Sequence, residues 1–289
     1  MPRPLPTTPT RKTTTATVLT HVRADGATIR RPDVLATEEP LQIMIGGPGQ
    51  ASIPVTVTMR TPGHDFELAV GFCFAEGLIR AGEVRSVRYC EVPRDEPQLY
   101  NVVSVRVDRP VDVTPRTSTT TAACGICGTA TLDDIEKACA RLDPADGPSM
   151  SVELLLALPE LLRRSQIVFD TTGGLHGAAL FDPVAGELSI VREDVGRHNA
   201  VDKVIGRAVL DRQVPFRHGA LVVSGRTSFE IVQKAAMAGV AIVAAVSAPT
   251  SLAVEAAQRL GVTLVGFVRP GSANVYAWPE RLTEPLTSR

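Results

Sequence analysis

The second half of the chain alternates short apolar runs with helical patterns, and no other sequence feature constrains the fold as strongly. Residues 220–223, 240–246 and 262–268 consist mainly of Val, Ile, Leu and Ala. The turns after the first two runs lead into segments whose apolar residues recur at helical spacing. Strands that are apolar at nearly every position are typical of a sheet with helices on both faces. The pattern therefore predicts a three-layer α/β domain, which we place at residues 150–289.

The same domain is expected to contain further helices and strands. Helices are predicted at residues 152–164 and 201–209, and strands at residues 166–170, 178–181 and 188–193. Pro159 lies inside the first helical pattern, where it is expected to kink or divide the helix. The last two strands are expected to pair as a hairpin, because a turn rich in Asp, Pro and Gly separates them.

The first half of the chain shows short strands around one helix, which predicts an α+β roll over residues 17–113. The strands are expected at residues 41–45, 53–59, 84–92 and 99–107, and the helix at residues 66–79. Asp65 directly precedes the helix and is expected to cap it. Residues 1–16 are rich in Pro and Thr and poor in large apolar side chains, so they are predicted to form a disordered tail.

The bulk composition disfavours several classes of protein. The formal net charge at pH 7 is −1, which gives no electrostatic reason to bind nucleic acid or an anionic membrane surface. No apolar run is long enough to span a bilayer, and the N-terminus lacks the apolar core of a secretory signal, so a cytoplasmic protein is expected. The five cysteines are an odd number in such a chain, which argues against a disulfide framework.

Residues 114–149, between the two predicted domains, carry the pair Cys124-Gly125-Ile126-Cys127. Small hydroxylated residues precede the pair and a glycine follows each cysteine, so we expect a mobile, exposed loop that presents two thiols. A helix at residues 132–142, capped by Thr131, and a linker are expected to follow.

Two cysteines at this spacing have several chemical uses. A structural zinc site needs four ligands, and the chain has no second Cys-x-x-Cys or His pair. A zinc-dependent nucleobase deaminase needs an upstream His-x-Glu, which is also missing, so no metal site is predicted. A thiol–disulfide redox pair and a nucleophile that carries a transferable group, such as a persulfide, remain equally supported by the spacing.

Hydroxyl and arginine side chains follow the three apolar runs. The turns are Ser224-Gly225-Arg226-Thr227-Ser228, residues 247–251 and residues 269–272. Ligands of open α/β sheets bind beyond the carboxyl ends of the strands, and helix amides and arginines there suit phosphate groups. A phosphorylated or nucleotide-like ligand is therefore as well supported as a purely structural role. Thr227 and Glu230 also have the spacing of a capping box. No Walker or Rossmann fingerprint is present, which disfavours an ordinary ATPase or dehydrogenase.

Four blocks of sequence resemble the family of formate dehydrogenase accessory sulfurtransferases, FdhD. The blocks are residues 123–128, 192–203, 224–230 and 271–276, and the resemblance runs in order from about Glu38 to Tyr276. The most specific parts are Cys124-Gly125-Ile126-Cys127-Gly128 and Gly196-Arg197-His198-Asn199-Ala200-Val201-Asp202-Lys203.

The resemblance implies a sulfur carrier that is required for formate dehydrogenase activity. Family members accept sulfur from a cysteine desulfurase as a persulfide on the cysteine loop. They pass it to the molybdenum of bis-molybdopterin guanine dinucleotide before that cofactor enters formate dehydrogenase. Members are cytoplasmic homodimers, and their second domain is similar to the cytidine deaminase fold without its zinc ligands. Cys124 and Cys127 are then the expected catalytic residues, with Cys124 the leading carrier and the order of transfer between them open.

The resemblance also implies a cofactor site in the C-terminal domain. Its residues are Phe267, Val268, Arg269, Pro270, Gly271 and Ser272, together with Ser224, Gly225, Arg226, Thr227, Ser228 and His198. Many members carry a second basic residue near Gly271, where this chain has Pro270 and Ser272. Asp202 and Lys203 are weaker candidates for shaping the site, and like His198 they are equally compatible with a helix cap or an ion pair.

Two other functions remain open from the sequence. A chaperone that binds the guanine dinucleotide cofactor would use the cysteines only as a redox sensor, so it would still support formate dehydrogenase after Cys124 and Cys127 are replaced by Ala. A thiol–disulfide oxidoreductase would form a reversible Cys124–Cys127 disulfide and act on dithiol substrates in general.

Overall fold

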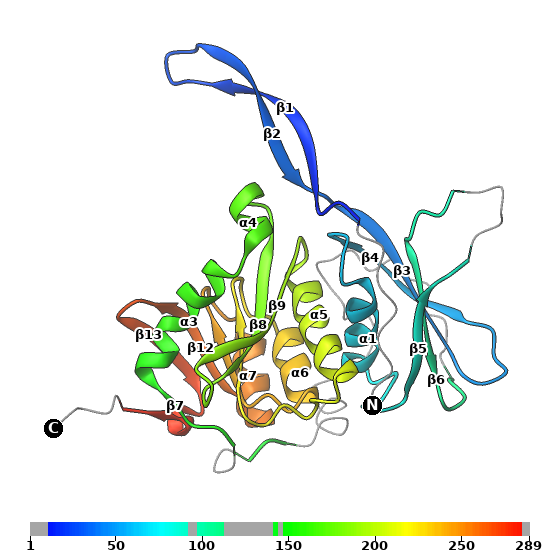
Figure 1. The fold of residues 1–289 in the computed structure, drawn as a ribbon. Helices are drawn as coiled ribbons and strands as arrows, with labels where there is room; N and C mark the ends of the chain where they lie inside the picture. Colours follow the sequence, from blue (N-terminus) through cyan, green and yellow to red (C-terminus); the bar gives the residue numbers. More distant parts are fainter. Residues whose placement is uncertain (1–10, 92–96, 113–140, 144–146, 285–289) are drawn as a thin grey trace.

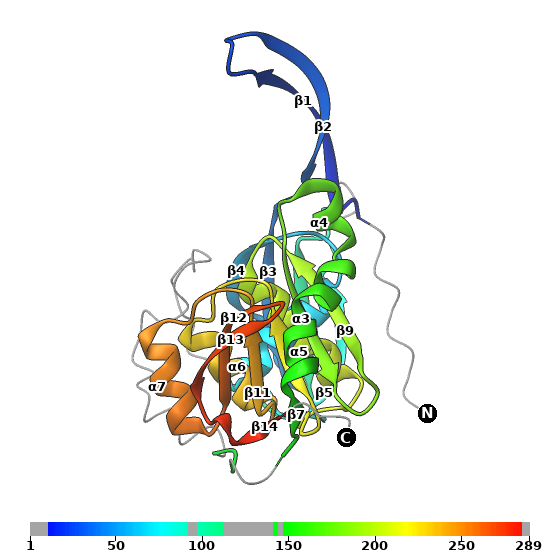
Figure 2. The ribbon, with the colours of Figure 1, turned by 90° about the vertical axis from the view of Figure 1, so that its left-hand side faces the viewer.

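The structure is a computed structural model of the 289-residue chain, and it describes residues 11–91, 97–112, 141–143 and 147–284. A four-stranded sheet, a six-stranded sheet and the helices between them form the body, and a long hairpin projects from it (Figure 1, Figure 2). The predicted combination of an N-terminal α+β unit with a C-terminal α/β unit is confirmed.

The C-terminal domain is built on the six-stranded sheet, in the order β13-β12-β11-β10-β8-β9. Its strands are β8 (His176–Asp182), β9 (Glu187–Asp194), β10 (Ala220–Val223), β11 (Ile242–Ala245), β12 (Thr263–Arg269) and β13 (Ser272–Ala277). The three central strands β10, β11 and β12 run parallel, and β8 and β9 form the predicted hairpin.

Helices cover both faces of this sheet, as the apolar strands predicted. On one face, α3 (Val152–Arg164) packs against side chains such as Phe181 and Val222. On the other face, α5 (Arg197–Leu210), α6 (Phe229–Met237) and α7 (Ser251–Leu260) pack over alternate residues of the same strands, such as Leu180 and Leu221. α3 continues through Pro159, and the short parallel pair β7 (Met150–Ser151) and β14 (Leu282–Thr283), with the 3-10 turn η1 (Pro279–Arg281), completes the domain.

The N-terminal unit is a four-stranded sheet with one helix. The sheet has the order β4-β3-β6-β5, and its elements are β3 (Glu39–Gly46), β4 (Ile53–Arg60), α1 (Asp65–Ala75), β5 (Val84–Tyr89) and β6 (Val102–Val107). α1 lies between this sheet and α5, so it is buried on nearly every side (Figure 1). Gly71 of α1 and Gly206 of α5 lie where the two helices cross. A Cβ on either residue would clash with the backbone of the other helix, so the close approach requires glycine at both positions. One hydrophobic core therefore continues from the N-terminal sheet into the C-terminal domain.

Several local predictions are wrong. β1 (Thr14–Val22) begins inside the segment predicted to be disordered, and with β2 (Thr28–Ala36) it forms a separate two-stranded sheet outside the roll. The strand predicted at residues 166–170 is a helix, α4 (Ile167–Thr172). The carboxylate of the distant Glu193 accepts hydrogen bonds from the amides of Val168 and Phe169, at 2.9 and 2.8 Å, and so caps a helix that the local sequence does not reveal.

The predicted cap of α1 is also wrong. The N-cap residue is His64, in a left-handed conformation, and no side chain caps the helix. Asp65 is fully buried and instead binds Arg60 through a two-pronged ion pair, with Nε–Oδ1 and Nη2–Oδ2 distances of 3.0 and 2.8 Å. The buried guanidinium of Arg60 binds the carboxylate, which is then not available to the helix end. The pattern of residues around the helix does not predict this ion pair.

Candidate functional site at the carboxyl ends of β10, β11 and β12

The turns that follow the three parallel strands are bonded directly to one another. The amide of Thr227 donates to the carbonyl of Ala248 at 3.1 Å, and the amide of Thr250 donates back to Thr227 at 3.0 Å. The amide of Phe267, near the end of β12, donates to the carbonyl of Ser247 at 3.2 Å. The prediction that these three turns meet at one edge of the sheet is therefore confirmed.

Some hydroxyl groups at this edge already have structural partners. Ser224 Oγ accepts from the amide of Gly177 at 2.8 Å, and Thr250 caps α7 by accepting from the amide of Ala253 at 3.3 Å. The capping box predicted for Thr227 and Glu230 is absent, because the N-cap of α6 is Ser228 and no side chain caps that helix. Thr227 is fully buried, and its hydroxyl has no hydrogen-bond partner among the described residues. A buried hydroxyl without a partner is a candidate contact for a ligand.

His198 links the starts of α5 and α6. Its Nε2 lies 2.8 Å from Ser228 Oγ and 2.9 Å from Glu230 Oε2. The predicted His198 therefore does lie beside the turn after β10, as the resemblance implied. Both contacts use the same ring nitrogen, so the histidine fixes this turn from the side of α5.

Two residues at the same edge were missed by the sequence reasoning. They are His176 and Arg197, which lie beside Gly225. A Cβ on Gly225 would lie 3.2 Å from His176 Nδ1 and 3.6 Å from Cβ of Arg197. Burial lowers the pKa of His176, and the nearby charge of Arg197 lowers it further. Arg197 Nε is buried and has no hydrogen-bond partner among the described residues. The signal was available in part, since Arg197 lies inside the Gly-Arg-His-Asn block.

The segment 267–272 forms an irregular end to β12. Phe267 has a positive φ of 51°, and the pairing between β12 and β13 shifts register between Gly266 and Arg269. Left-handed backbone at a bulky residue is strained, and such strain is common at functional sites. The Phe267 side chain is exposed while Val268 is buried. Arg269 folds back, and its Nη1 donates to the carbonyls of Val246 and Val268, so its charge is already partly used.

Arg226 is the more available cation at this edge. It is exposed, and the described part of the chain gives its guanidinium no hydrogen-bond or ion-pair partner. An unpaired arginine beside helix amides is suited to a phosphate group.

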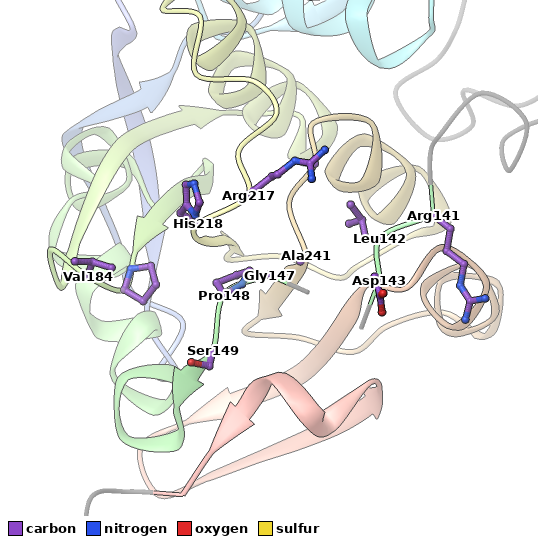
Figure 3. Close-up of a pocket in the computed structure, with 12 residues that line it drawn as sticks. Arg141, Leu142, Asp143, Gly147, Pro148, Ser149, Val184, Arg217, His218 and Ala241 are labelled. Atoms are coloured by element: carbon purple, nitrogen blue, oxygen red, sulfur yellow. The ribbon is translucent and has the colours of Figure 1, made fainter. Parts of the chain in front are cut away.

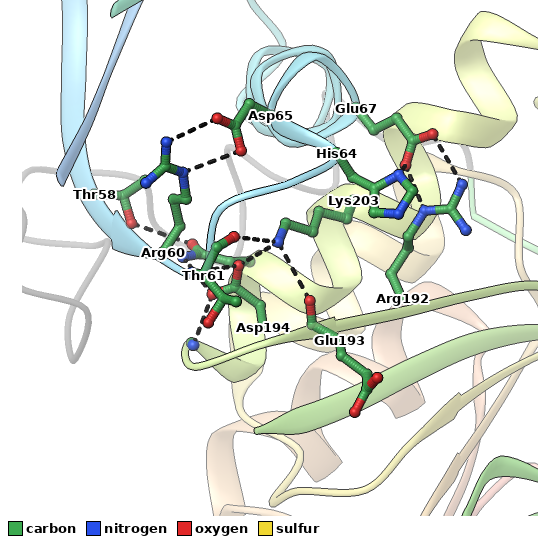
Figure 4. Close-up of polar contacts among 12 residues, drawn as sticks. Thr58, Arg60, Thr61, His64, Asp65, Glu67, Arg192, Glu193, Asp194 and Lys203 are labelled. Carbon is green, nitrogen blue, oxygen red and sulfur yellow. Dashed lines mark hydrogen bonds and ion pairs between the residues drawn. The ribbon is translucent and has the colours of Figure 1, made fainter. Parts of the chain in front are cut away.

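A buried polar network holds the turn between β9 and α5 in place (Figure 4). Asp194 is fully buried, and its Oδ2 lies 2.6 Å from Lys203 Nζ. Lys203 also donates to the backbone carbonyl of Thr61 at 2.9 Å, and Asn199 Nδ2 donates to the carbonyl of Met59 at 2.7 Å. The Gly-Arg-His-Asn block is therefore tied to the loop between β4 and α1, so the N-terminal unit supports the turn that carries Arg197 and His198.

The two weaker candidates have structural roles. Lys203 pairs with Asp194, and Asp202 pairs with Lys234 on α6, with a distance of 2.6 Å between Nζ and Oδ1. Neither pair has helical spacing, because each partner comes from another element. These side chains join elements beneath the sheet edge and do not form part of its surface.

A cavity of about 480 Å³ lies at the opposite end of the sheet (Figure 3). Arg217 and His218 line it from the segment before β10, and Gly239 and Ala241 line it from the segment before β11. It therefore lies at the amino ends of the parallel strands and is separate from the predicted ligand edge.

Several predictions fall on residues outside the described ranges. Cys124, Cys127, Thr131 and residues 132–140 of the predicted helix are among them, whereas Arg141 and Leu142, its last two residues, are described and are not helical. Within the described ranges, no three His, Cys, Asp or Glu side chains are grouped in a way that would hold a metal ion. No described helix is both long and apolar enough to cross a bilayer.

Comparison with known proteins gives a consistent set of relatives. The model of the FdhD/NarQ family matches residues 36–283. A sulfur carrier protein FdhD from Mycolicibacterium paratuberculosis is 50% identical over 272 residues, which cover 91% of this chain and 97% of the relative. A sulfur carrier protein FdhD from Nocardia farcinica is 51% identical over 256 residues, which cover 88% and 90%.

One solved structure is similar over nearly the whole fold. It is the crystal structure of a candidate formate dehydrogenase accessory protein from Desulfotalea psychrophila, with a TM-score of 0.74 and 26% sequence identity. The match covers 94% of this chain and 100% of that chain.

Proposed function

Because the chain belongs to the FdhD/NarQ family, we propose that it is a sulfur carrier for the maturation of formate dehydrogenase. A cysteine desulfurase supplies the sulfur, which the chain holds as a persulfide and transfers to the molybdenum of bis-molybdopterin guanine dinucleotide. That cofactor is the acceptor substrate, and formate dehydrogenase receives it afterwards. The observation that carries the proposal is the junction of three turns beside the Thr227 hydroxyl, which has no partner among the described residues, in a chain whose relatives are named sulfur carriers.

The loading step is a thiolate exchange at Cys124. The Cys124 thiolate attacks the terminal sulfur of the desulfurase persulfide, and the desulfurase cysteine leaves as a thiolate. The new sulfur–sulfur bond on Cys124 replaces the one that breaks, so this step needs no outside oxidant or reductant. Cys127 either takes over the sulfur from Cys124 or stabilises its thiolate. Release of the sulfur to the acceptor returns the carrier cysteine to a thiolate.

The sheet edge supplies the groups that would hold the phosphates of the acceptor. Arg226 is exposed and unpaired among the described residues, and within the same residues Arg197 Nε and the buried Thr227 hydroxyl have no hydrogen-bond partner. Arg269 would contribute its charge only by exchanging its bonds to backbone carbonyls. His198 acts by positioning, since Ser228 and Glu230 already occupy its Nε2.

The proposal extends to the quaternary structure and the cell compartment. We take the working unit to be a cytoplasmic homodimer with sulfurtransferase activity, whose protein partners are the desulfurase and formate dehydrogenase. The edge at β10 to β12 serves the cofactor, and the cysteine segment serves the desulfurase.

Intact-protein mass spectrometry tests sulfur loading. Wild type, Cys124→Ala and Cys127→Ala are incubated with a cysteine desulfurase and cysteine, and the loaded state of the desulfurase is checked in the same tube. A reductant-labile sulfur adduct on wild type that disappears in Cys124→Ala is the expected result. No adduct on wild type would exclude the carrier function and leave the cofactor chaperone as the better explanation.

Calorimetric titration with guanosine diphosphate tests the acceptor edge separately. Removing a charge-assisted contact to phosphate costs roughly 1.5–3 kcal/mol, so Arg226→Ala should raise the dissociation constant about tenfold or more. Arg164→Ala, which removes an exposed arginine of α3, is the matched control and should bind as wild type. Equal affinity of both variants would place the nucleotide elsewhere.

A further inference from the structure

The hairpin of β1 and β2 stands away from the body of the protein (Figure 1, Figure 2). All residues from 20 to 32 are exposed, and the described contacts of the hairpin with the body are near its base, where Ala36 approaches Gly174. A two-stranded hairpin is at best marginally stable in water without a third strand or a covering helix. Strands of nine residues each therefore call for a further partner.

Two backbone hydrogen bonds fix which groups of β1 face away from β2. The amide of Arg23 donates to Ala27 and the amide of Thr37 donates to Thr13, each at 2.9 Å, and the register between them is unbroken. Bonded pairs alternate along an antiparallel ladder, so the odd-numbered residues of β1 bond to β2. The even-numbered residues direct their N–H and C=O groups to the open edge: Thr14, Ala16, Val18, Thr20 and Val22.

The two edges of the hairpin differ in chemistry. β1 reads Thr-Thr-Ala-Thr-Val-Leu-Thr-His-Val and contains no proline and no Asp, Glu, Lys or Arg. β2 contains Arg30, Arg31, Pro32 and Asp33, and the same alternation places the missing N–H of Pro32 on the outer edge. Proline and charge are the usual means by which an edge strand resists pairing. The β2 edge is thus protected and the β1 edge is open.

Two exposed valines of β1 lie on one face of the hairpin. Even-numbered side chains of both strands point to one side of the hairpin, because side chains alternate along a strand. Val18 and Val22 are 56% and 64% exposed there, and Pro32 and Val34 lie opposite on β2. A partner strand added to β1 would continue the face that carries Val18 and Val22, and it would oppose no Asp, Glu, Lys or Arg side chain of β1.

We propose that β1 pairs antiparallel with β1 of a second copy of this chain, about a two-fold axis at Val18. In this register Val18 faces its own copy and Ala16 faces Thr20, so the five outward residues form roughly ten backbone hydrogen bonds. The result is a four-stranded sheet in the order β2-β1-β1-β2. Pairing through β2 would instead lack the Pro32 donor at the centre of the outer edge.

The position of Pro32 also makes the assembly end at two chains. Both outer strands of the combined sheet are β2, so neither outer edge accepts a further copy, and the interface is closed and isologous. The hairpin precedes almost all of the region matched by the family model, which begins at residue 36, so this surface is not part of the matched family core. The inference names the surface of the homodimer proposed above and rests on that part of the proposed function, but it does not depend on sulfur transfer.

Sedimentation velocity on the full chain tests the β1–β1 pairing by means of variants that place a charge at Val18, next to the two-fold axis. Val18→Lys and Val18→Asp each put two like charges face to face, and either should raise the dimer dissociation constant at least about a hundredfold. An equimolar mixture of the two variants should restore a dimer that contains one of each. Leu35→Lys, with the same charge on the opposite face of β2, is the control and should dimerise as wild type.

Several outcomes would overturn the inference: a monomeric wild type, single variants that dimerise normally, or a mixture that stays monomeric. Hydrogen exchange on wild type gives an independent reading should a variant fail to fold. The amides of Ala16, Val18 and Thr20 should become protected as protein concentration rises through the dimer transition. Unchanged exchange at these amides would also refute the pairing.

Discussion

Replacing Lys203 by Met should strongly destabilise the protein, because it leaves a buried carboxylate without its cation. Lys203 and Asp194 are 1% and 0% exposed, and their ion pair is 2.6 Å long. The substitution keeps the length of the side chain and removes the charge together with hydrogen bonds to the carbonyls of Thr61 and Glu193. Breaking one half of a buried pair costs roughly 3–5 kcal/mol of unfolding free energy.

Urea unfolding followed by far-ultraviolet circular dichroism measures this loss. The matched control is Arg164→Met, which breaks an ion pair of similar length to Glu160 whose side chains are 73% and 58% exposed. Such a surface pair contributes at most about 1 kcal/mol. The double variant Asp194→Asn with Lys203→Met should regain part of the lost stability, because it no longer buries an unpaired charge. Equal effects of Lys203→Met and Arg164→Met would show that the buried network does not join the two units as described.

Three further outcomes follow from individual contacts. Gly206→Ala should lower the urea midpoint by the equivalent of about 1–3 kcal/mol or more, because its Cβ would collide with the carbonyl of Glu67 on α1, and an unchanged midpoint would contradict the close helix crossing. Burial raises the pKa of Glu67, but hydrogen bonds from Arg192 and His64 outweigh it and lower the pKa to about 2. The carboxylate therefore stabilises the fold fully above its ordinary pKa near 4.5, and that contribution is lost as pH falls towards 2. The stability gap between wild type and Glu67→Gln should be constant above pH 4.5 and narrow below it in unfolding curves, and a gap independent of pH would be inconsistent with this. His176 should titrate below its ordinary value in proton NMR, and Arg197→Gln should raise its midpoint by removing a nearby positive charge, whereas an unmoved midpoint would mean that the two side chains are not neighbours.

Elements with strong local periodicity were predictable, and elements set by distant partners were not. The apolar runs at β10, β11 and β12 gave the sheet and the meeting of its three turns. The segment of α4 was predicted as a strand, because the residue that caps this helix is Glu193 on β9 and the local sequence does not show it. The same cause explains Asp65, whose carboxylate binds Arg60 and not the helix end.

The candidate site shows the same division. Arg226, Thr227 and His198 were found from turn chemistry and from a sequence block with a family resemblance. His176 was not, because its place beside Gly225 depends on the pairing of β8 with β10. The capping box expected at Thr227 does not form, and only the structure shows that this hydroxyl is buried with no described partner.

The sequence by itself determined the family, the alternation of strands and helices, and the residues at the strand ends, because these depend on short-range patterns and on specific motifs. Only the tertiary structure decided that the two units share one core, since this rests on the approach of Gly71 to Gly206 across more than a hundred residues. It also decided that Asp202 and Lys203 serve buried ion pairs with other elements. Burial and pairing partners are properties of the folded chain, and no local pattern encodes which distant side chain will arrive.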